Sequence, residues 1–344
     1  MKILITGVSG FAGRHLLDMF AQNPGNLTEI QRNGKNRSGK PGENSLKEKI
    51  SVLGIDSNEV EPPCHPEMDF SFIRTDLRKI SAVEKAVRNF RPDVIYHLAA
   101  QSSVKYSWEK PVETLEINVT GGINLFEAAV KFCPDCRILV ACTAEEYKSS
   151  QEPAGGDPPL TEEHSIFPAN PYAISKACLD FFSSIYYKSK NLKIFITRSF
   201  NHLGPGQSEK FVASDFAKQV SLIEKGLAEP VIETGNLEVF RDFLDVRDVV
   251  KAYRCIVERG RPGQPYNVCS GEKIKIKSLL EILVSYSTCG SIDIRIDRSK
   301  FRPIDTFSVY GDNNKLIKDT GWCPEYGIRQ SLLDILNWWR ERSF

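Results

Sequence analysis

The sequence has no excess of charge of either sign and no long hydrophobic run. Its 45 Lys and Arg residues are balanced by 44 Asp and Glu residues, which gives a net charge of +1. A chain with so little net charge is not expected to bind nucleic acid. No stretch of about 18 apolar residues is present, so no membrane span is expected. The start, MKILITG, turns polar too soon for a signal peptide and is typical of a first β-strand.

The sequence also lacks a regular cysteine pattern. Its nine cysteines are an odd number, and several of them lie in apolar segments, which is typical of reduced thiols in a cytoplasmic protein. Cys133 and Cys136 have the spacing of half a zinc site, but no second CxxC pair exists to complete it. We therefore expect no metal, and we interpret this pair as a turn between a helix and a strand.

Strand-like and helix-like runs alternate through the first 200 residues. This alternation predicts an α/β fold with a Rossmann-type, doubly wound parallel sheet and helices on both faces. The expected strands cover residues 1–6, 50–56, 70–76, 93–100, 137–142 and 192–200, and the expected helices cover 14–22, 113–132 and 172–189.

The pattern changes after Asn201, where Gly and Pro recur in LGPGQ, GRPGQP and FRP. We expect a smaller α+β C-terminal domain here, formed by residues 201–237 and 263–344. The sheet domain would comprise residues 1–200 and about 238–262. Residues 23–50 interrupt it with a segment rich in Gly, Asn, Ser and Lys and poor in apolar residues. Such a composition predicts a mobile surface insertion.

A glycine-rich turn follows the first strand. In ITGVSGFAGRH, Gly7, Gly10 and Gly13 surround Phe11 and open the first helix. Small residues in this place let the backbone approach a pyrophosphate, whose charge meets the N-terminus of the helix. The motif therefore predicts a dinucleotide site, with an ordinary tight turn as the alternative.

The next two strands end in acidic residues. Asp56 ends the second strand, where a carboxylate accepts hydrogen bonds from the ribose hydroxyls of NAD and repels a 2′-phosphate. It lies about twice the usual ~20 residues from the glycines, and the insertion accounts for the excess. We therefore favour NAD(H), with NADP(H) as the alternative; Asp56 as a solvated strand end would be the other interpretation. Asp76 and Leu77 end the third strand, where they would reach the adenine.

The fourth strand runs into YHLAAQSS, and the fifth ends in a polar cluster. His97 is interpreted as a core histidine, and Leu98, Ala99 and Ala100 as part of the cofactor site. The apolar run RILVAC leads into Thr143 and Glu145. Polar groups at the carboxyl ends of buried strands are where open α/β sheets place their chemistry.

Tyr172 and Lys176 are four residues apart, so on a helix they share one face. An ammonium beside a phenol favours the phenolate and lowers the pKa of the tyrosine. Tyr172 is thus a candidate general acid or base for a carbonyl or alcohol oxygen. An ordinary surface pair is the alternative for this motif taken alone.

Taken together, the glycine turn, DL, HLAA, INV, Thr143, YAISK and RSFNHLGPGQ resemble the extended short-chain dehydrogenase/reductases that act on nucleotide sugars. The resemblance implies that Tyr172 is the acid/base and that Thr143 hydrogen-bonds the reacting oxygen. It implies that Lys176 binds the nicotinamide ribose and tunes Tyr172, and that Asn118 helps to hold that helix and its proton path. Glu145 matches a glutamate that removes the C5 proton in 4,6-dehydratases and that reductases often retain.

The second half, with FNHLGPGQ, RDFLDVRDVVKAY, YNVCSG and RPID, resembles GDP-4-keto-6-deoxy-D-mannose reductases. This resemblance implies reduction of the 4-keto group by NAD(P)H to give GDP-D-rhamnose or a close isomer, with the C-terminal domain binding the nucleotide sugar. A GDP-mannose 4,6-dehydratase, a 4-epimerase or reductase acting on another nucleotide sugar, and a binding protein remain alternatives. The expected substrate-binding residues are Gln101, Ser102, Asn201, Arg241, Arg302 and Asp305.

Two of these residues have structural alternatives. Arg241 could instead form a salt bridge with Asp242 or Asp245, and Arg302 could be a surface residue. The resemblance also implies a homodimer built on the helices around residues 113–130 and 172–187. The aromatic pairs Phe181–Phe182 and Tyr186–Tyr187 would supply its apolar surface.

Overall fold

The structure is a computed structural model that describes residues 1–22, 50–60, 68–148, 158–301 and 306–344. Apart from Ile50, which is buried, the expected mobile insertion at 23–50 lies outside the described residues. Arg302 and Asp305 lie outside them as well.

A seven-stranded parallel sheet forms the centre of the larger domain, as the alternating sequence pattern predicts. The strand order is β11-β6-β5-β4-β1-β2-β3. The order reverses between β1 and β4, the place where doubly wound sheets bind their ligands. The strands are β1 (Lys2–Thr6), β2 (Ser51–Asp56), β3 (Asp69–Arg74), β4 (Val94–His97), β5 (Arg137–Thr143), β6 (Lys193–Ser199) and β11 (Pro265–Val268).

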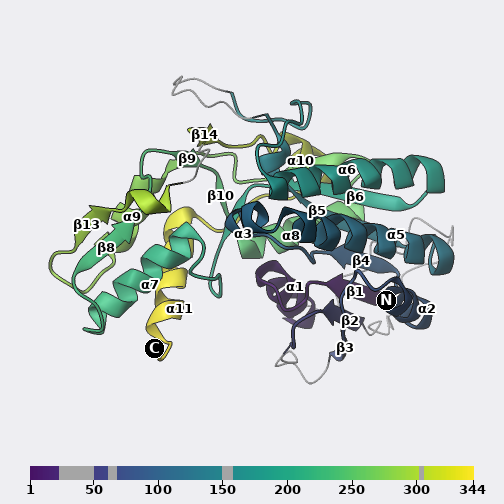
Figure 1. Cartoon of the computed structure of the whole chain (residues 1–344), viewed down its shortest axis with the longest axis horizontal. Helices are drawn as coiled ribbons and strands as arrows, with labels where there is room; N and C mark the ends of the chain where they lie inside the picture. The colour runs from purple at the N-terminus through teal and green to yellow at the C-terminus, as the bar shows by residue number, and fades with distance from the viewer. Residues whose placement is uncertain (23–49, 61–67, 149–157, 302–305) are drawn as a thin grey trace, which may run out of the picture.

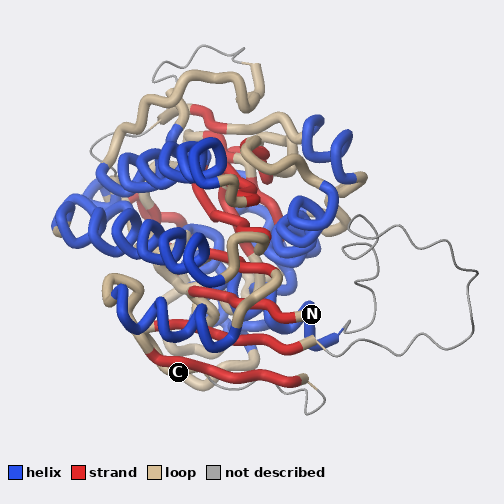
Figure 2. The backbone as a smooth tube through the Cα atoms, turned by 90° about the vertical axis from the view of Figure 1, so that its right-hand side faces the viewer, coloured by secondary structure: helices blue, strands red, loops and turns tan. Residues whose placement is uncertain are grey.

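Helices cover both faces of this sheet (Figure 2). One face packs against α1 (Phe11–Gln22) and α8 (Val246–Arg259), and the other packs against α2 (Ile80–Phe90), α5 (Gly121–Phe132) and α6 (Pro171–Lys190). The central strands are apolar toward both faces; for example, Ile3, Leu4 and Ile5 are fully buried. A strand covered on both sides needs such a continuous apolar run.

Between β4 and α5 the chain forms three short helical segments, α3 (Val104–Glu109), α4 (Pro111–Leu115) and a π-helical turn, Glu116–Thr120. The chain forms a 3₁₀ turn at Ala144–Glu146, directly after β5. In the part of the chain that the structure describes, no helix is long and apolar enough to cross a membrane.

The smaller region lies beside the sheet domain (Figure 1). Its core joins α7 (Val212–Glu224), α9 (Ile276–Ser285) and α11 (Ile328–Arg340). The remaining elements are the strands β7 (Asn201–Leu203), β8 (Val231–Thr234), β9 (Phe240–Arg241), β10 (Phe243–Asp245), β12 (Ile274–Lys275), β13 (Asp293–Ile296) and β14 (Ser308–Val309), the 3₁₀ turn Arg298–Lys300 and the helix α10 (Asn314–Thr320).

The expected boundaries of the two domains need correction in two places. The strand β11 pairs with β6 in the large sheet, although residues from 263 onward were expected in the smaller domain. Conversely, β9 pairs with β12 and β14, although residues from about 238 were expected in the sheet domain. These strands have two to four residues, so local sequence patterns do not indicate the partner with which each one pairs.

Candidate active site

The glycine turn after β1 has the geometry that a dinucleotide pyrophosphate requires. Gly7 has φ +74°, and its N–H donates to the carbonyl oxygen of Ile55 at 2.8 Å. A Cβ added at Gly7 would lie 2.6 Å from the backbone nitrogen of Ala99, and one at Gly13 would lie 2.1 Å from the carbonyl oxygen of Gly7. The turn therefore cannot accept side chains at these positions, and it leads directly into α1, which begins at Phe11.

Asp56 lies beside the glycine turn and is hydrogen-bonded to it. Its carboxylate accepts the backbone N–H of Ser9 at 3.0 Å and the Ser9 hydroxyl at 2.7 Å, and it also accepts the N–H of Asn58 at 3.0 Å. The end of β2 thus lies against the glycine turn, as the sequence predicted. Asp56 is held in place by these contacts and is not a freely solvated strand end.

Asp76 and Leu77 lie at the end of the next strand, and both are fixed by neighbours. Arg78 donates to the Asp76 carboxylate at 2.9 and 2.6 Å, and this hydrogen bonding lowers the pKa of Asp76. The Asn124 amide donates to the carbonyl oxygen of Leu77 at 2.8 Å. Asn124 therefore ties α5 to the edge where the adenine is expected.

The segment after β4 is held by Thr6. The Thr6 hydroxyl accepts the N–H of Ala99 at 3.3 Å and lies 2.8 Å from His97 Nδ1, while the Thr6 carbonyl accepts the N–H of Leu98. His97 is a core residue, as expected, since it is 1% exposed. Burial, with help from the charge of Lys176, lowers the pKa of His97 to about 3.

Thr143 and Tyr172 meet at the carboxyl end of β5. Thr143 is the last residue of β5, and Tyr172 lies in the first turn of α6. The Thr143 hydroxyl lies near the Tyr172 phenol and acts to lower its pKa. Burial first, and then the nearby carboxylate of Glu145, outweigh this effect, so the pKa of Tyr172 is raised. These effects keep the phenol protonated.

Lys176 points toward the sheet beneath Tyr172. Its ammonium donates to the carbonyl oxygen of Ala141 at 2.7 Å, and burial lowers its pKa. The sequence predicted that this ammonium would lower the pKa of Tyr172. In the structure the pKa of Tyr172 is raised instead, because burial and Glu145 outweigh the other groups.

Glu145 belongs to the same pocket, and Asn170 holds it there. The amide of Asn170 donates to the Glu145 carboxylate at 2.8 Å, while its oxygen caps α6 by accepting the N–H of Ala173 at 2.8 Å. Sequence reasoning missed Asn170. The Asn-Pro pair at the start of the helix was the available signal, since Asn is a preferred N-cap and Pro a preferred first residue.

Asn118 lies buried in the π-helical turn and joins two parts of the site. Its amide donates to the Ser175 hydroxyl on α6 at 2.8 Å and to the Gln101 carbonyl at 3.0 Å, and its oxygen accepts the Gln101 N–H at 2.8 Å. It therefore holds α6 against the segment after β4. Short π-helical turns are frequently found at functional sites.

The expected substrate residues are less closely grouped. The Gln101 amide donates to Ser103 and Thr114, which engages it in positioning α3 and α4, and Ser102 is exposed. Asn201 is exposed at the start of β7. Arg241 donates to the carbonyl oxygens of Phe240 and Thr306 at 2.7 and 2.8 Å.

The two aspartates considered as salt-bridge partners of Arg241 interact with other groups. Asp242 accepts hydrogen bonds from Ser270, Gly271 and Gly311, and Asp245 pairs with Arg247 at 2.8 Å. The placement of Arg302 and Asp305 is outside the described residues. Cys133 and Cys136 form the expected turn between α5 and β5, with free thiols.

Comparison with known proteins gives the family. Residues 4–335 match the family described as GDP-mannose 4,6 dehydratase. The chain belongs to this family. Proteins with similar sequences include GDP-6-deoxy-D-mannose reductase of Pseudomonas aeruginosa, 36% identical over 251 residues, which cover 73% of this chain and 81% of the relative. GDP-mannose 4,6 dehydratase 2 of Arabidopsis thaliana is 27% identical over 330 residues, which cover 95% of this chain and 83% of the relative.

Solved structures agree with this family. The structure of RMD from Pseudomonas aeruginosa complexed with NADPH has a TM-score of 0.80 at 30% identity and covers 99% of both chains. UDP-glucose 4-epimerase of Thermus thermophilus in complex with NAD also has a TM-score of 0.80, at 26% identity over the full length of both chains. The chain is therefore an enzyme of the NAD(P)-dependent class that acts on nucleotide sugars, with an extended short-chain dehydrogenase/reductase fold.

Proposed function

We propose that this enzyme reduces the 4-keto group of GDP-4-keto-6-deoxy-D-mannose with NAD(P)H, forming GDP-D-rhamnose or a close isomer. The observation that carries this proposal is the 36% identity to a GDP-6-deoxy-D-mannose reductase, against 27% for the plant dehydratase. The pairing of Thr143 with Tyr172 at the end of β5 supports it. We further propose Thr143, Tyr172, Lys176 and Glu145 as the residues of the reacting centre.

The reaction needs one proton and one hydride at the carbonyl group of the sugar. The dinucleotide, when bound against the glycine turn, supplies the hydride to C4. Tyr172 donates its phenolic proton to O4, and Thr143 hydrogen-bonds the same oxygen. An acid must hold its proton until the hydride arrives, and burial, which raises the pKa of Tyr172, keeps the phenol protonated. Lys176, from its place beneath Tyr172, would bind the nicotinamide ribose.

For the cofactor we propose NAD(H), because Asp56 lies where a 2′-phosphate would meet its negative charge. The bond from Ser9 holds the carboxylate in that place. The Pseudomonas aeruginosa structure contains NADPH, so NADP(H) is the competing cofactor. Substitution Asp56→Asn should lower kcat/KM for NADH and raise it for NADPH. An enzyme that prefers NADPH before the substitution would contradict the proposed role of Asp56.

A second candidate, GDP-mannose 4,6-dehydratase, is favoured by the position of Glu145. Asn170 holds this carboxylate close enough to Tyr172 to raise the pKa of the phenol. A dehydratase needs such a base, whereas a reductase does not. Glu145→Gln should therefore leave most of a reductase activity intact, while a dehydratase would lose its turnover.

We also propose a homodimer, formed through an apolar surface on α4 and α6. This surface comprises Val112, Leu115, Ile174, Phe181 and Ile185, which are all exposed in the single chain. The expected aromatic surface is smaller than the sequence indicated, because Phe182 packs on the core and Tyr186 packs against Phe126. The spacing of Ile174, Phe181 and Ile185 places them on one face of α6.

We place the enzyme in the cytoplasm on the evidence of its cysteines. All eight cysteines in the described part of the chain are free thiols. Reduced thiols are typical of proteins from a reducing compartment.

Isotope transfer tests the reductase directly. The enzyme is supplied with GDP-4-keto-6-deoxy-D-mannose and with reduced dinucleotide deuterated at C4 of the nicotinamide, and the product is examined by NMR. We expect one deuterium at C4 of a GDP-6-deoxyhexose. Product formed from GDP-mannose without net cofactor oxidation would support the dehydratase instead.

A further inference from the structure

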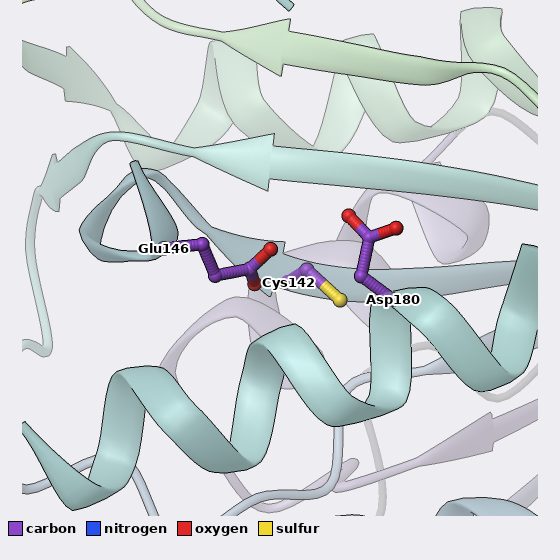
Figure 3. A group of neighbouring side chains, drawn as sticks. All are labelled: Cys142, Glu146 and Asp180. Atoms are coloured by element: carbon purple, nitrogen blue, oxygen red, sulfur yellow. The ribbon is translucent and has the colours of Figure 1, made fainter. Parts of the chain in front are cut away.

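A buried cluster between α6 and the sheet is not used by the proposed reaction. It consists of Cys142, Glu146 and Asp180, which face one another in Figure 3, and one ligand atom of each lies within 4.8 Å of the others. Arg198 Nε lies 2.9 Å from Asp180 Oδ2 and 3.8 Å from Glu146 Oε2. A metal ion would meet this positive charge, so we interpret the carboxylates as internal partners of Arg198.

The strand β13 forms an open edge of a small sheet. It pairs in parallel with β8 and, among the described residues, with no other strand. All of its residues are exposed, and the exposed fraction is 44% for Ile294 and 57% for Ile296. In Figure 1 the two strands lie on the side of the smaller region that faces away from the sheet domain. The edge is therefore accessible to another chain.

The backbone of β13 presents hydrogen-bonding groups to this open side. The N–H of Asp293 donates to the carbonyl oxygen of Pro230, just before β8, at 2.8 Å. Because backbone groups alternate along a strand, those of Ile294 and Ile296 face away from β8. An edge strand that presents such groups is a template for a further strand.

The opposite edge of the same sheet is closed by side chains. The N–H of Glu233 on β8 donates to Gln219 Oε1 at 2.9 Å, and Gln219 Nε2 donates to the carbonyl oxygen of Glu233 at 3.1 Å. Lys300 Nζ donates to the same carbonyl oxygen at 3.0 Å. A further strand can therefore join this sheet only at β13.

The sequence around β13 is complementary to itself in an antiparallel pair. Its side chains alternate, with Ile292, Ile294 and Ile296 on one face and Asp293 and Arg295 on the other. Pairing two copies antiparallel about Ile294 places Ile292 of one copy opposite Ile296 of the other. Asp293 of each copy then lies opposite Arg295 of the other. Unlike charges in directly opposite positions stabilise a strand pair, whereas like charges destabilise it.

The other registers lose this match. A register centred on Asp293 sets the two copies of Asp293 against each other, and a register centred on Arg295 does the same for Arg295. A slip by one residue sets isoleucines against charged side chains. Arg295 also lies 3.6 Å from Glu233 on β8. In the register about Ile294, each arginine would therefore lie between two carboxylates.

We propose that β13 is an interaction surface whose partner is β13 of a second copy of this chain, paired antiparallel about Ile294. The two copies are then related by a two-fold axis, and each contact occurs twice, as in other isologous interfaces. This surface is separate from the apolar surface on α4 and α6, and it does not depend on the proposed reaction. A short strand buries little area, so we expect association at on the order of 100 µM rather than at micromolar concentration.

Charge reversal tests this pairing in a protein that lacks the other surface. The parent is Phe181→Arg, and its mass is measured by sedimentation equilibrium up to about 500 µM. We expect the parent to form dimers in this range. Adding Asp293→Arg or Arg295→Asp should abolish them, because like charges then face each other. An equal mixture of these two variants should associate again, since every arginine then faces an aspartate.

Lys277→Asp in the same parent is the matched control. Lys277 forms an exposed ion pair with Glu281 on α9, at 3.8 Å, and its reversal should leave association unchanged. Recovery in the mixture also shows that both reversed variants are folded. A parent that stays monomeric at about 500 µM, a reversal without effect, or a mixture that does not associate would overturn the proposal.

Hydrogen exchange locates the contact within the associated protein. The amides of Ile294 and Ile296 should exchange several-fold more slowly in the mixture than in either variant alone, because pairing engages them in hydrogen bonds. Association that leaves the exchange of these amides unchanged would show that the copies meet elsewhere, which would also overturn the proposal.

Discussion

Tyr172 is the residue on which the proposed chemistry most depends. Replacing it with Phe removes the proton donor but keeps the ring that packs at the start of α6. We expect turnover of Tyr172→Phe to fall about 10²- to 10⁴-fold, the usual contribution of a general acid, while dinucleotide binding stays near the wild-type value. Steady-state rates and a fluorescence titration measure the two quantities.

Tyr187→Phe provides the control on the same helix. Tyr187 lies roughly four turns further along α6, where its ring packs beside Gly263. This variant should keep full turnover. If Tyr172→Phe were equally active, the assignment of Tyr172 as the acid would be wrong.

At this scale the sequence predicted the identities of the proposed catalytic residues better than their environment. Thr143 and Tyr172 do meet, because the end of β5 and the start of α6 come together at the carboxyl edge of the sheet, where open α/β sheets place their chemistry. The direction of the Tyr172 pKa could not be predicted, because it depends on burial and on the position of Glu145. Asn170 was missed because its partner, Glu145, comes beside it only once the turn after β5 has formed.

Among the elements, the glycine turn between β1 and α1 allows a specific prediction about stability and dinucleotide binding. Gly7 has φ +74°, and a methyl group there would meet the backbone of Ala99 and Leu98. Gly7→Ala should therefore destabilise the fold by about 1–3 kcal/mol and weaken dinucleotide binding. Urea unfolding and an NADH titration measure the two effects.

Gly290→Ala is a matched control for this substitution. A Cβ at Gly290 has no neighbouring atom within 4 Å. We expect this variant to keep wild-type stability and affinity. Unimpaired dinucleotide binding by a folded Gly7→Ala protein would show that the cofactor lies elsewhere.

The longer elements were predictable from periodicity, and the shortest ones were not. Six of the sheet strands and the helices α1, α5 and α6 follow directly from the apolar runs, whereas α2 was not expected. The four-residue strand β11 was placed in the wrong domain because its pairing with β6 joins residues about 70 positions apart, and parallel pairing leaves no local signal. The broken helix around Asn118 was likewise expected as one continuous helix.

For the whole molecule, buried neutral histidines predict a loss of stability in acid. The pKa of His97 is about 3 in the folded protein and 6.5 in its ordinary state. Between these values the unfolded chain binds more protons, so stability is full above pH 6.5 and falls as pH drops toward 3. One pKa unit corresponds to ~1.4 kcal/mol. The shifted pKa of His97 should therefore lower the free energy of unfolding by about 2–3 kcal/mol between pH 7 and pH 4.5.

His97→Asn isolates this contribution, since its amide oxygen can replace Nδ1 as the partner of Thr6. The variant should be less stable than the wild type at pH 7, and the difference should shrink at pH 4.5. Denaturant midpoints at both pH values measure it. His202, which burial also keeps neutral, titrates in both proteins and cancels in the difference. A constant difference across this range would contradict the account of His97.

The assembly is tested at the apolar surface of α4 and α6. Phe181 is 54% exposed in the single chain, a large fraction for an aromatic residue. Phe181→Arg should convert a dimer into a monomer, as measured by sedimentation at micromolar concentration. Leu227→Arg, at a similarly exposed apolar position outside this surface, should remain dimeric. Sedimentation of the wild-type protein as a monomer would contradict the proposed dimer.

The central claim is that this enzyme is a reductase, and the stoichiometry of cofactor oxidation tests it most directly. Purified protein is mixed with GDP-4-keto-6-deoxy-D-mannose and a limiting amount of NADH or NADPH, and the absorbance of the reduced nicotinamide is followed while the product is quantified. We predict one dinucleotide oxidised for each GDP-6-deoxyhexose formed. Turnover of GDP-mannose to a keto-sugar with no net oxidation would contradict the account and identify a dehydratase.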